Sequence, residues 1–295
     1  MRILIVKPSS LGDVIHALPT VNLIRQKFPE AHIAWLINSE LSSLLKHCPV
    51  INDRIEFHRR DSGTWWPMLR RLRQERFDLV VDLQGLLRSG FFTFATGAAR
   101  RVGLSDAREG ARVFYNEVVN VPRIHAIDRY LLAAQHLGCP EGLVVFSLGV
   151  GDRKRDGLIA LNPLARWETK VWGDENFSAL LERLPVERVV LIGSARERDR
   201  IESINRGRAR NLADQLDLFA LAELYRQCAV VISNDTGPMH LAAAVGTPVI
   251  ALFGPTDPAL VGPYGTGHVV IRSPTGDVRA ITIEQVLAAA KPFLA

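Results

Sequence analysis

The chain has 295 residues, of which 47% are hydrophobic and 23% charged, a composition typical of a globular protein with about two domains. No apolar run approaches the roughly 20 residues that span a bilayer, and no secretion signal opens the chain, so we expect a cytoplasmic protein. The three cysteines, Cys48, Cys139 and Cys228, lie far apart, which excludes a disulfide framework and a cysteine-rich zinc site.

The positive charge is concentrated in the first half of the chain. Residues 1–150 contain 19 Lys and Arg against 14 Asp and Glu, whereas residues 151–295 contain 17 of each. Of the 36 basic residues, 30 are Arg, whose planar guanidinium matches two oxygens of a carboxylate or a phosphate. We therefore expect an anionic partner for the first half. The alternative is a solvated basic surface without a partner.

Short apolar runs typical of buried strands alternate with patterns typical of amphipathic helices. The predicted strands cover 2–6, 33–37, 78–82, 158–162, 189–192 and 230–232. The predicted helices begin near residues 13, 66, 175, 196, 238 and 283. This alternation predicts an α/β fold with parallel sheets that are covered on both faces. The polar, glycine-flanked segment 149–157 predicts a linker, so we expect two domains, over 1–150 and 151–295.

The stretch 229–258 predicts a site for an anion in the second domain. A buried strand is followed by a turn and by a helix that has Pro238 in its first turn and stops at Gly246. Ligands of open α/β sheets bind at the carboxyl ends of strands, and helix N-termini attract anions. The candidate residues at this position are Asp235, Thr236, Gly237 and His240. Plain capping of the helix by Asp235 and Thr236 is the alternative.

Two charged residues have the right placement for transfer chemistry. Asp13 follows a strand and a glycine-containing turn at the start of a helix, where a carboxylate can take a proton from an attacking hydroxyl. The helix N-terminus lowers its pKa and weakens it as a base, and capping is again the alternative. Lys170 lies between two tryptophans after the strand 158–162 and can neutralise a leaving diphosphate, unless it is an ordinary surface lysine.

Four motifs, in this order, resemble glycosyltransferase family 9, the lipopolysaccharide heptosyltransferases. They are VKPSSLGDVIH at 6–16, WETKVW at 167–172, NDTGPMH at 234–240 and FGPTDP at 253–258. The resemblance runs nearly from end to end. The first and the last motif are most similar to the enzymes that add the first heptose to the Kdo sugar of lipid A.

This resemblance implies a GT-B fold, with two Rossmann-like domains facing across a cleft, and an inverting transfer from ADP-heptose to Kdo-lipid A. In this sequence Asp13 matches the family's general base, and Lys170, Asp235, Thr236, Gly237 and His240 match its donor site. The implied acceptor residues are Ser10, Gly12, Arg59, Arg60 and Arg108. The acceptor also implies peripheral contact with the cytoplasmic face of the inner membrane. The final helix crosses back onto the first domain in many GT-B proteins.

No cofactor and no metal is expected, because the chain contains no Asp-x-Asp motif of the kind that bridges a diphosphate through a metal ion. Three other interpretations remain open. The nearest is another family 9 enzyme, which adds the second heptose or uses a different nucleotide sugar. The second is a nucleotide-sugar epimerase, which needs no basic first domain. The third, a nucleic-acid-binding module, is suggested only by the isoelectric point of about 9.4 and is not expected, because no recognised motif interleaves basic and stacking aromatic residues.

Overall fold

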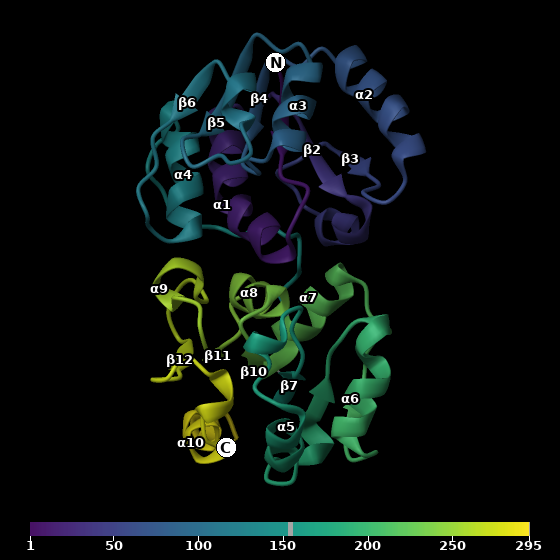
Figure 1. Ribbon diagram of the computed structural model, residues 1–295, viewed down its shortest axis with the longest axis vertical. Coiled ribbons are helices and arrows are strands. Elements are labelled where there is room, and N and C mark those ends of the chain that lie inside the picture. Colours follow the sequence, from purple (N-terminus) through teal and green to yellow (C-terminus); the bar gives the residue numbers. More distant parts are fainter. Residues whose placement is uncertain (153–155, 295) are drawn as a thin grey trace. The chain divides into compact units, whose positions relative to one another are not determined.

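The computed structural model describes residues 1–152 and 156–294 and divides into two compact units, Met1–Gly149 and Val150–Ala295 (Figure 1). The boundary falls within the predicted linker at 149–157, of which residues 153–155 lie outside the described part. Each unit contains its own six-stranded sheet, and every strand pair in both sheets is parallel. The predicted α/β class with two parallel sheets is therefore confirmed.

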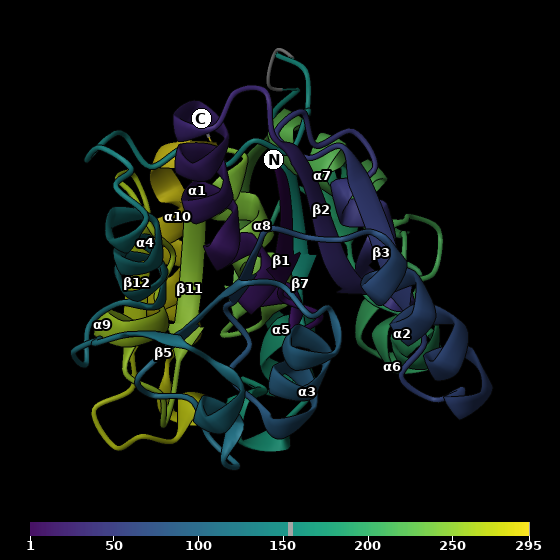
Figure 2. The ribbon, with the colours of Figure 1, turned by 90° about the horizontal axis from the view of Figure 1, so that it is seen from above.

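The first unit alternates strands and helices along the chain. Its elements are β1 (Arg2–Val6), α1 (Leu11–Lys27), β2 (His32–Asn38), η1 (Ser39–Leu45), β3 (Asp53–Phe57), η2 (Ser62–Thr64), α2 (Trp65–Gln74), β4 (Leu79–Asp82), α3 (Leu87–Ala95), β5 (Arg100–Leu104), η3 (Ala111–Phe114), β6 (Glu117–Val119) and α4 (Ala126–His136). The sheet has the order β3-β2-β1-β4-β5-β6. Helices α1 and α4 pack together on one face, and α2 and α3 cover the other (Figure 2).

The second unit repeats this plan. Its elements are β7 (Leu158–Asn162), η4 (Glu168–Lys170), α5 (Asp174–Leu181), η5 (Val186–Arg188), β8 (Val189–Leu191), η6 (Ala195–Glu197), α6 (Arg198–Asn205), β9 (Arg210–Asn211), α7 (Leu218–Gln227), β10 (Cys228–Asn234), α8 (Gly237–Ala244), β11 (Val249–Phe253), α9 (Pro258–Val261), β12 (Val269–Arg272), η7 (Val278–Ala280) and α10 (Ile283–Leu294). The sheet order is β12-β11-β10-β7-β8-β9, so both sheets place their first and fourth strands side by side at the centre. Val286 and Ala290 of α10 are buried in the core of this unit.

The strands that read as apolar runs form the centres of the two sheets because both of their faces are covered. All residues of β4 and β11 are buried, as are all but the first of β1 and β7. Helix α8 ends where Gly246 adopts a φ of 75°, which is the helix stop that the sequence predicts. In both units the strand order reverses between the two central strands, and open α/β sheets bind their ligands at the carboxyl ends of such strands.

Candidate active site

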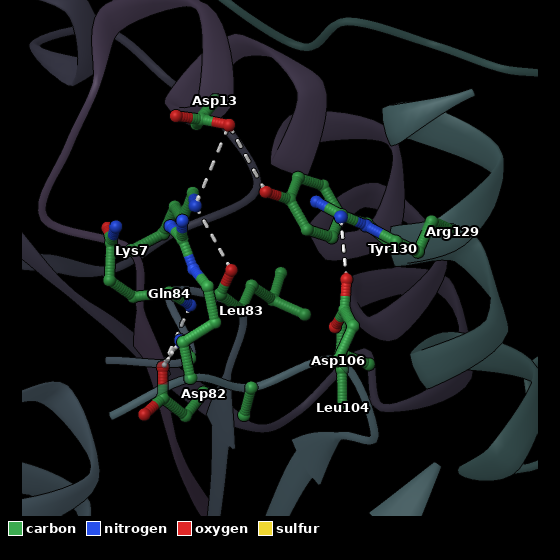
Figure 3. Close-up of a pocket in the computed structure, with 12 residues that line it drawn as sticks. Lys7, Asp13, Asp82, Leu83, Gln84, Leu104, Asp106, Arg129 and Tyr130 are labelled. Atoms are coloured by element: carbon green, nitrogen blue, oxygen red, sulfur yellow. Dashed lines mark hydrogen bonds and ion pairs between the residues drawn. The ribbon is translucent and has the colours of Figure 1, made fainter. Parts of the chain in front are cut away.

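A cavity of about 350 Å³ lies in the first unit, beyond the carboxyl ends of β1 and β4 (Figure 3). Each part of its wall comes from a different loop or helix of the unit. The charged and polar lining residues are Lys7, Asp13, Asp82, Gln84, Asp106, Arg108, Arg129 and Tyr130. Because strand ends, the loops after them and the helices α1 and α4 on one face all contribute, the fold of the unit sets the shape of this cavity.

Asp13 lies in the first turn of α1, which begins at Leu11, two residues before the predicted start. One carboxylate oxygen, Oδ2, accepts hydrogen bonds from the backbone N–H and the hydroxyl of Ser10, at 3.1 and 2.7 Å. The other, Oδ1, accepts a hydrogen bond from the hydroxyl of Tyr130 at 3.3 Å and lies 3.9 Å from Nζ of Lys7. One oxygen of Asp13 therefore caps the helix while the other is presented to the cavity.

The electrostatics of the site keep Asp13 ionised. Burial by itself raises the pKa of Asp13, but the charge of Lys7 and the hydrogen bonds from Ser10 outweigh it and lower this pKa to about 2. The Asp13 side chain is still 37% exposed, whereas that of Lys7 is only 3% exposed. The carboxylate is thus the accessible member of this pair.

Lys7 is held on three sides. Its ammonium group donates a hydrogen bond to the carbonyl of Leu83 at 3.0 Å and lies 5.1 Å from the centre of the Tyr130 ring. The guanidinium of Arg129 lies 4.9 Å from the centre of the same ring and forms an ion pair of 2.6 Å with Asp106. Lys7, Tyr130 and Arg129 therefore form a cationic and aromatic wall beside Asp13.

Asp82 supports the base of the cavity. It is fully buried, and its carboxylate accepts the backbone N–H groups of Gln84 and Gly85 at 2.8 and 3.1 Å and the hydroxyl of Tyr115 at 2.7 Å. Burial raises the pKa of Asp82 despite these hydrogen bonds. The Tyr115 ring fits over β5 because residue 103 is glycine, where a Cβ would lie 2.2 Å from a ring carbon. Asp82 thus fixes the turn after β4.

The predicted acceptor residues fall in four places. Ser10 contacts Asp13, and Gly12 is buried in the first turn of α1. Arg108 lines the large cavity. Arg59 lines a smaller neighbouring hollow, which shares Gln84 with the large one. Arg60 is exposed and belongs to the lining of neither of these two cavities.

The second unit brings together residues from three motifs. Nζ of Lys170 lies 2.5 Å from Oδ2 of Asp235, and the hydroxyl of Thr256 donates to the same oxygen at 2.5 Å. The side chain of Asn234 positions the lysine loop, because it accepts the N–H of Trp172 at 3.0 Å and donates to the carbonyl of Pro163 at 2.7 Å. Here the side chain of Lys170 is 22% exposed and that of Asp235 only 5%. The exposed member of this pair is the lysine.

The N-terminus of α8 adjoins this pair. Thr236 occupies the N-cap position in an extended conformation, but its side chain accepts no capping hydrogen bond, and Gly237 is the first helical residue. Asp235 does not cap the helix either, since both of its described side-chain contacts go to Lys170 and Thr256 through Oδ2. His240 is buried one turn further along. Within the first turn Pro238 has no N–H and the N–H of Met239 donates to the carbonyl of Thr236 at 3.1 Å, so the turn is partly satisfied by its own backbone.

Within 1–152 and 156–294, no group of three or more His, Cys, Asp or Glu side chains is placed to hold a metal ion. In the same ranges, no helix combines the length and the apolarity needed to cross a bilayer.

Comparison with known proteins identifies the family. The sequence profile of glycosyltransferase family 9 (heptosyltransferase) matches residues 65–289. The chain is a member of this family. It is 34% identical to lipopolysaccharide heptosyltransferase 1 of Pseudomonas aeruginosa PAO1, over 92% of this chain and 84% of that protein. The predicted glycosyltransferase activity in lipopolysaccharide core synthesis is therefore confirmed.

Solved structures agree with this assignment. The E. coli heptosyltransferase WaaC with ADP superimposes on this heptosyltransferase with a TM-score of 0.87 at 26% identity, covering 99% of this chain and 100% of WaaC. The E. coli ADP-heptose lipopolysaccharide heptosyltransferase II superimposes with a TM-score of 0.86 at 25% identity, covering 100% and 98% of the two chains. This chain is thus similar both to a protein named heptosyltransferase 1 and to one named heptosyltransferase II.

Sequence reasoning assigned no role to four residues that build the two sites. Lys7 and Thr256 belong to recognised motifs, and Lys7 directly follows a buried strand, a signal that could have been used. Asp82 ends a predicted strand in the same way. Tyr130 carries no such signal, because it reaches Asp13 only through the packing of α4 against α1.

Proposed function

We propose that this heptosyltransferase moves L-glycero-D-manno-heptose from ADP-heptose to the Kdo sugar of Kdo-lipid A, with inversion at the anomeric carbon. The observation that carries the proposal is the opposite exposure of two lysine–carboxylate pairs. In the first unit the carboxylate of Asp13 is accessible and its lysine is buried, as a base requires. In the second unit Lys170 is accessible and its carboxylate is buried, as an anion-binding site requires.

We assign the acceptor to the first unit, the domain over 1–150. Its cavity presents Asp13 together with Lys7 and Arg108, and residues 1–150 hold the whole excess of positive charge. A Kdo carboxylate or a lipid A phosphate is a suitable partner for these cations. Ser10, Gly12, Arg59 and Arg60 complete the proposed acceptor site.

Asp13 then acts as the general base that takes the proton of the acceptor hydroxyl. A carboxylate whose pKa is about 2 is a weak base, so its contribution lies in position and constant ionisation. The hydroxyl becomes more acidic as its oxygen bonds to the anomeric carbon. The proton therefore moves to Asp13 late in this displacement.

We assign the donor to the second unit, the domain over 151–295. Lys170 has three N–H donors, so it can bind a diphosphate oxygen while it keeps its contact with Asp235. Thr236, Gly237 and His240 surround the start of α8, where the helix dipole favours the negative charge of the departing ADP. The ADP in the WaaC structure supports this donor class.

The charge on the leaving ADP is neutralised by Lys170 and α8, so we expect transfer without a metal ion. Turnover should be the same in EDTA and in added Mg²⁺ or Mn²⁺. Loss of turnover in the chelator, with recovery on adding either metal, would show that the diphosphate needs a cation that the protein does not supply.

The decisive experiment measures heptose transfer from ADP-heptose to deacylated Kdo-lipid A by mass spectrometry of the product. The parent enzyme should form the product, and Asp13→Asn should form it at least about 100-fold more slowly, as expected when a general base is removed. If the parent enzyme forms no product, the proposed substrates are wrong. An undiminished rate in Asp13→Asn refutes the assigned base alone.

A second candidate is transfer of the second heptose, which the similarity to heptosyltransferase II favours. The same assay separates the two, because this activity requires an acceptor that already carries one heptose. Product formed only from the heptosylated acceptor assigns the enzyme to the second step. Replacing ADP-heptose with other nucleotide sugars tests the donor in the same way.

A lipid-linked acceptor requires the enzyme to work at a membrane surface. We propose peripheral contact with the cytoplasmic face of the inner membrane, supported by the basic character of the first unit. No nucleic acid partner is proposed.

A further inference from the structure

Helix α3 has an exposed face that is apolar, the reverse of the usual pattern for a helix on a protein surface. Leu87 is 49% exposed, Phe91 45% and Phe94 55%. Their spacing of four and three residues places the three side chains within about 60° of one another around the helix. Three large apolar side chains therefore point away from the unit along one line.

The opposite face of α3 explains why this arrangement is fixed. Phe92 and Thr93 are fully buried against the sheet and its neighbours, so the helix cannot rotate its apolar face inward. Gly90 lets η3 approach closely, since a Cβ there would lie 2.7 Å from the Phe114 ring. The centre of that ring lies 6.5 Å from that of Phe91 and 5.9 Å from that of Phe94. The exposed rings are therefore held in place.

The short helix η3 extends the apolar surface. Val113 is 80% exposed and directly precedes Phe114, which contacts both exposed rings. We call the four side chains together the α3 patch: Leu87, Phe91, Phe94 and Val113.

The charge around the α3 patch is positive. The segment 86–114 contains five Arg and no Lys against one Asp and one Glu. The guanidinium of Arg101 lies 5.8 Å from the centre of the Phe94 ring, and Arg112 is exposed beside Val113. Apolar side chains bordered by arginine suit a surface that combines acyl chains with phosphate groups.

The position of the patch relates it to the acceptor site. Leu86 and Arg88, on either side of Leu87, line the smaller hollow that shares Gln84 with the Asp13 cavity. At the other end of the segment, Arg108 lines the Asp13 cavity three residues before η3. The patch therefore adjoins the loops that form both cavities.

We propose that the α3 patch docks the first unit on an anionic lipid bilayer, with its four apolar side chains inserted at the boundary between headgroups and acyl chains. Four side chains form a small contact for a stable protein partner, which needs about 800 Å² from each side. Interfacial insertion needs only a few apolar anchors and neighbouring cations. The inference deepens the proposed membrane contact, but its measurement requires no turnover.

The experiment measures binding of the full chain to large unilamellar vesicles by co-sedimentation. Vesicles of phosphatidylcholine with 30% phosphatidylglycerol should bind the parent, and pure phosphatidylcholine should bind it much more weakly. The double variant Phe91→Ser/Phe94→Ser should lose at least about tenfold in affinity, because about half of each side chain is still exposed and burying the two exposed halves is equivalent to burying about one whole Phe, roughly tenfold or more. Arg112→Gln should reduce the difference between the two vesicle types.

Leu143→Ser provides the matched control. Leu143 is 86% exposed and follows Gly142, where an added Cβ would lie 3.2 Å from Leu23 of α1, so this segment lies on the α1 face of the sheet, opposite α3. This variant should bind vesicles like the parent. Equal affinities for the parent and the double variant, with both folded by circular dichroism, overturn the proposal. So does a parent dimer that the double variant converts to monomer without any change in vesicle binding.

Turnover separates this inference from the proposed function. With a deacylated acceptor the double variant should match the parent, whereas with vesicle-embedded acceptor it should be slower by the factor lost in binding. If the parent transfers no heptose to either acceptor, the proposed substrates are wrong. The binding of the parent and the double variant to vesicles still decides the role of the α3 patch.

Discussion

Replacing Tyr115 by Phe tests whether the buried Asp82 carboxylate supports the first unit. The substitution removes one hydroxyl and leaves the ring, so it creates almost no cavity. The Asp82 oxygen that accepts this hydroxyl at 2.7 Å then loses its partner in a fully buried position. Leaving a buried acceptor unsatisfied costs about 1–3 kcal/mol of the free energy of unfolding, with the larger values for charged groups.

The loss should grow with pH. Burial raises the pKa of Asp82 in the folded protein, so stability from this group is greatest when the carboxyl is protonated in both states. It falls as the pH rises above the ordinary Asp value and through the folded pKa. The Tyr115 hydroxyl lowers that folded pKa, so removing it raises the pKa further and extends the loss to higher pH. We expect the loss to be larger at pH 8 than at pH 5, within the range of about 1–3 kcal/mol.

Scanning calorimetry at the two pH values provides the measurement. For a unit of this size, about 3 kcal/mol corresponds to a fall of roughly 6–12 °C in the melting temperature. Tyr225→Phe is the control, because Tyr225 is also buried but its hydroxyl has no hydrogen-bond partner within the described residues. That variant should change the melting temperature by less than about 1 °C or raise it. Equal shifts in the two variants, or a Tyr115→Phe shift that does not depend on pH, would refute the reasoning.

Three further predictions concern the two sites. Because the pKa of Asp13 is about 2, the pH profile of kcat/KM should show no acid limb from this group between pH 5 and 8, and an Asp13-dependent limb in that range contradicts the charge environment described. Lys170→Met should weaken ADP binding by about 10–100-fold in calorimetric titration, with Lys170→Arg retaining part of the affinity; unchanged affinity removes Lys170 from the donor site. Gly103→Ala should lower the melting temperature of the first unit by several degrees, because its Cβ meets the Tyr115 ring, and a melting temperature equal to the parent's excludes that clash.

The two sheets were predictable from the sequence because their central strands are buried on both faces. Such strands appear as short apolar runs, and the predicted ranges 2–6 and 158–162 coincide with β1 and β7. The short edge elements β6, β9 and β12 escaped prediction. β9 has only two residues, too few to give a strand pattern, whereas β12 does contain a short apolar run at 269–271 that was not used, and its residues alternate between partial burial and exposure.

The predicted site residues were less determined by local pattern. Capping and catalysis require the same carboxylate at the same place, so the sequence could not decide between them for Asp13. In the structure one oxygen of Asp13 accepts from Ser10 and the other from Tyr130, so capping does not exclude the proposed role as a base. For Asp235 the outcome differs, since Lys170, distant in sequence, takes the carboxylate that local pattern would assign to the helix. Neither the two partners of Asp13 nor the pairing of Asp235 with Lys170 could be predicted from the spacing of these residues in the sequence.

The common strand order of the two units makes their differences informative. Asp82 and Asp235 both stand at the carboxyl end of a fourth strand, yet one is sealed by Tyr115 and the other is paired with an accessible lysine. A carboxylate sealed in this way cannot exchange a proton with substrate. In the first unit the accessible carboxylate on the first helix is Asp13, to which we assign the role of base. The same sheet thus presents an accessible anion in one unit and an accessible cation in the other, and the proposed displacement uses the first on the hydroxyl and the second on the diphosphate.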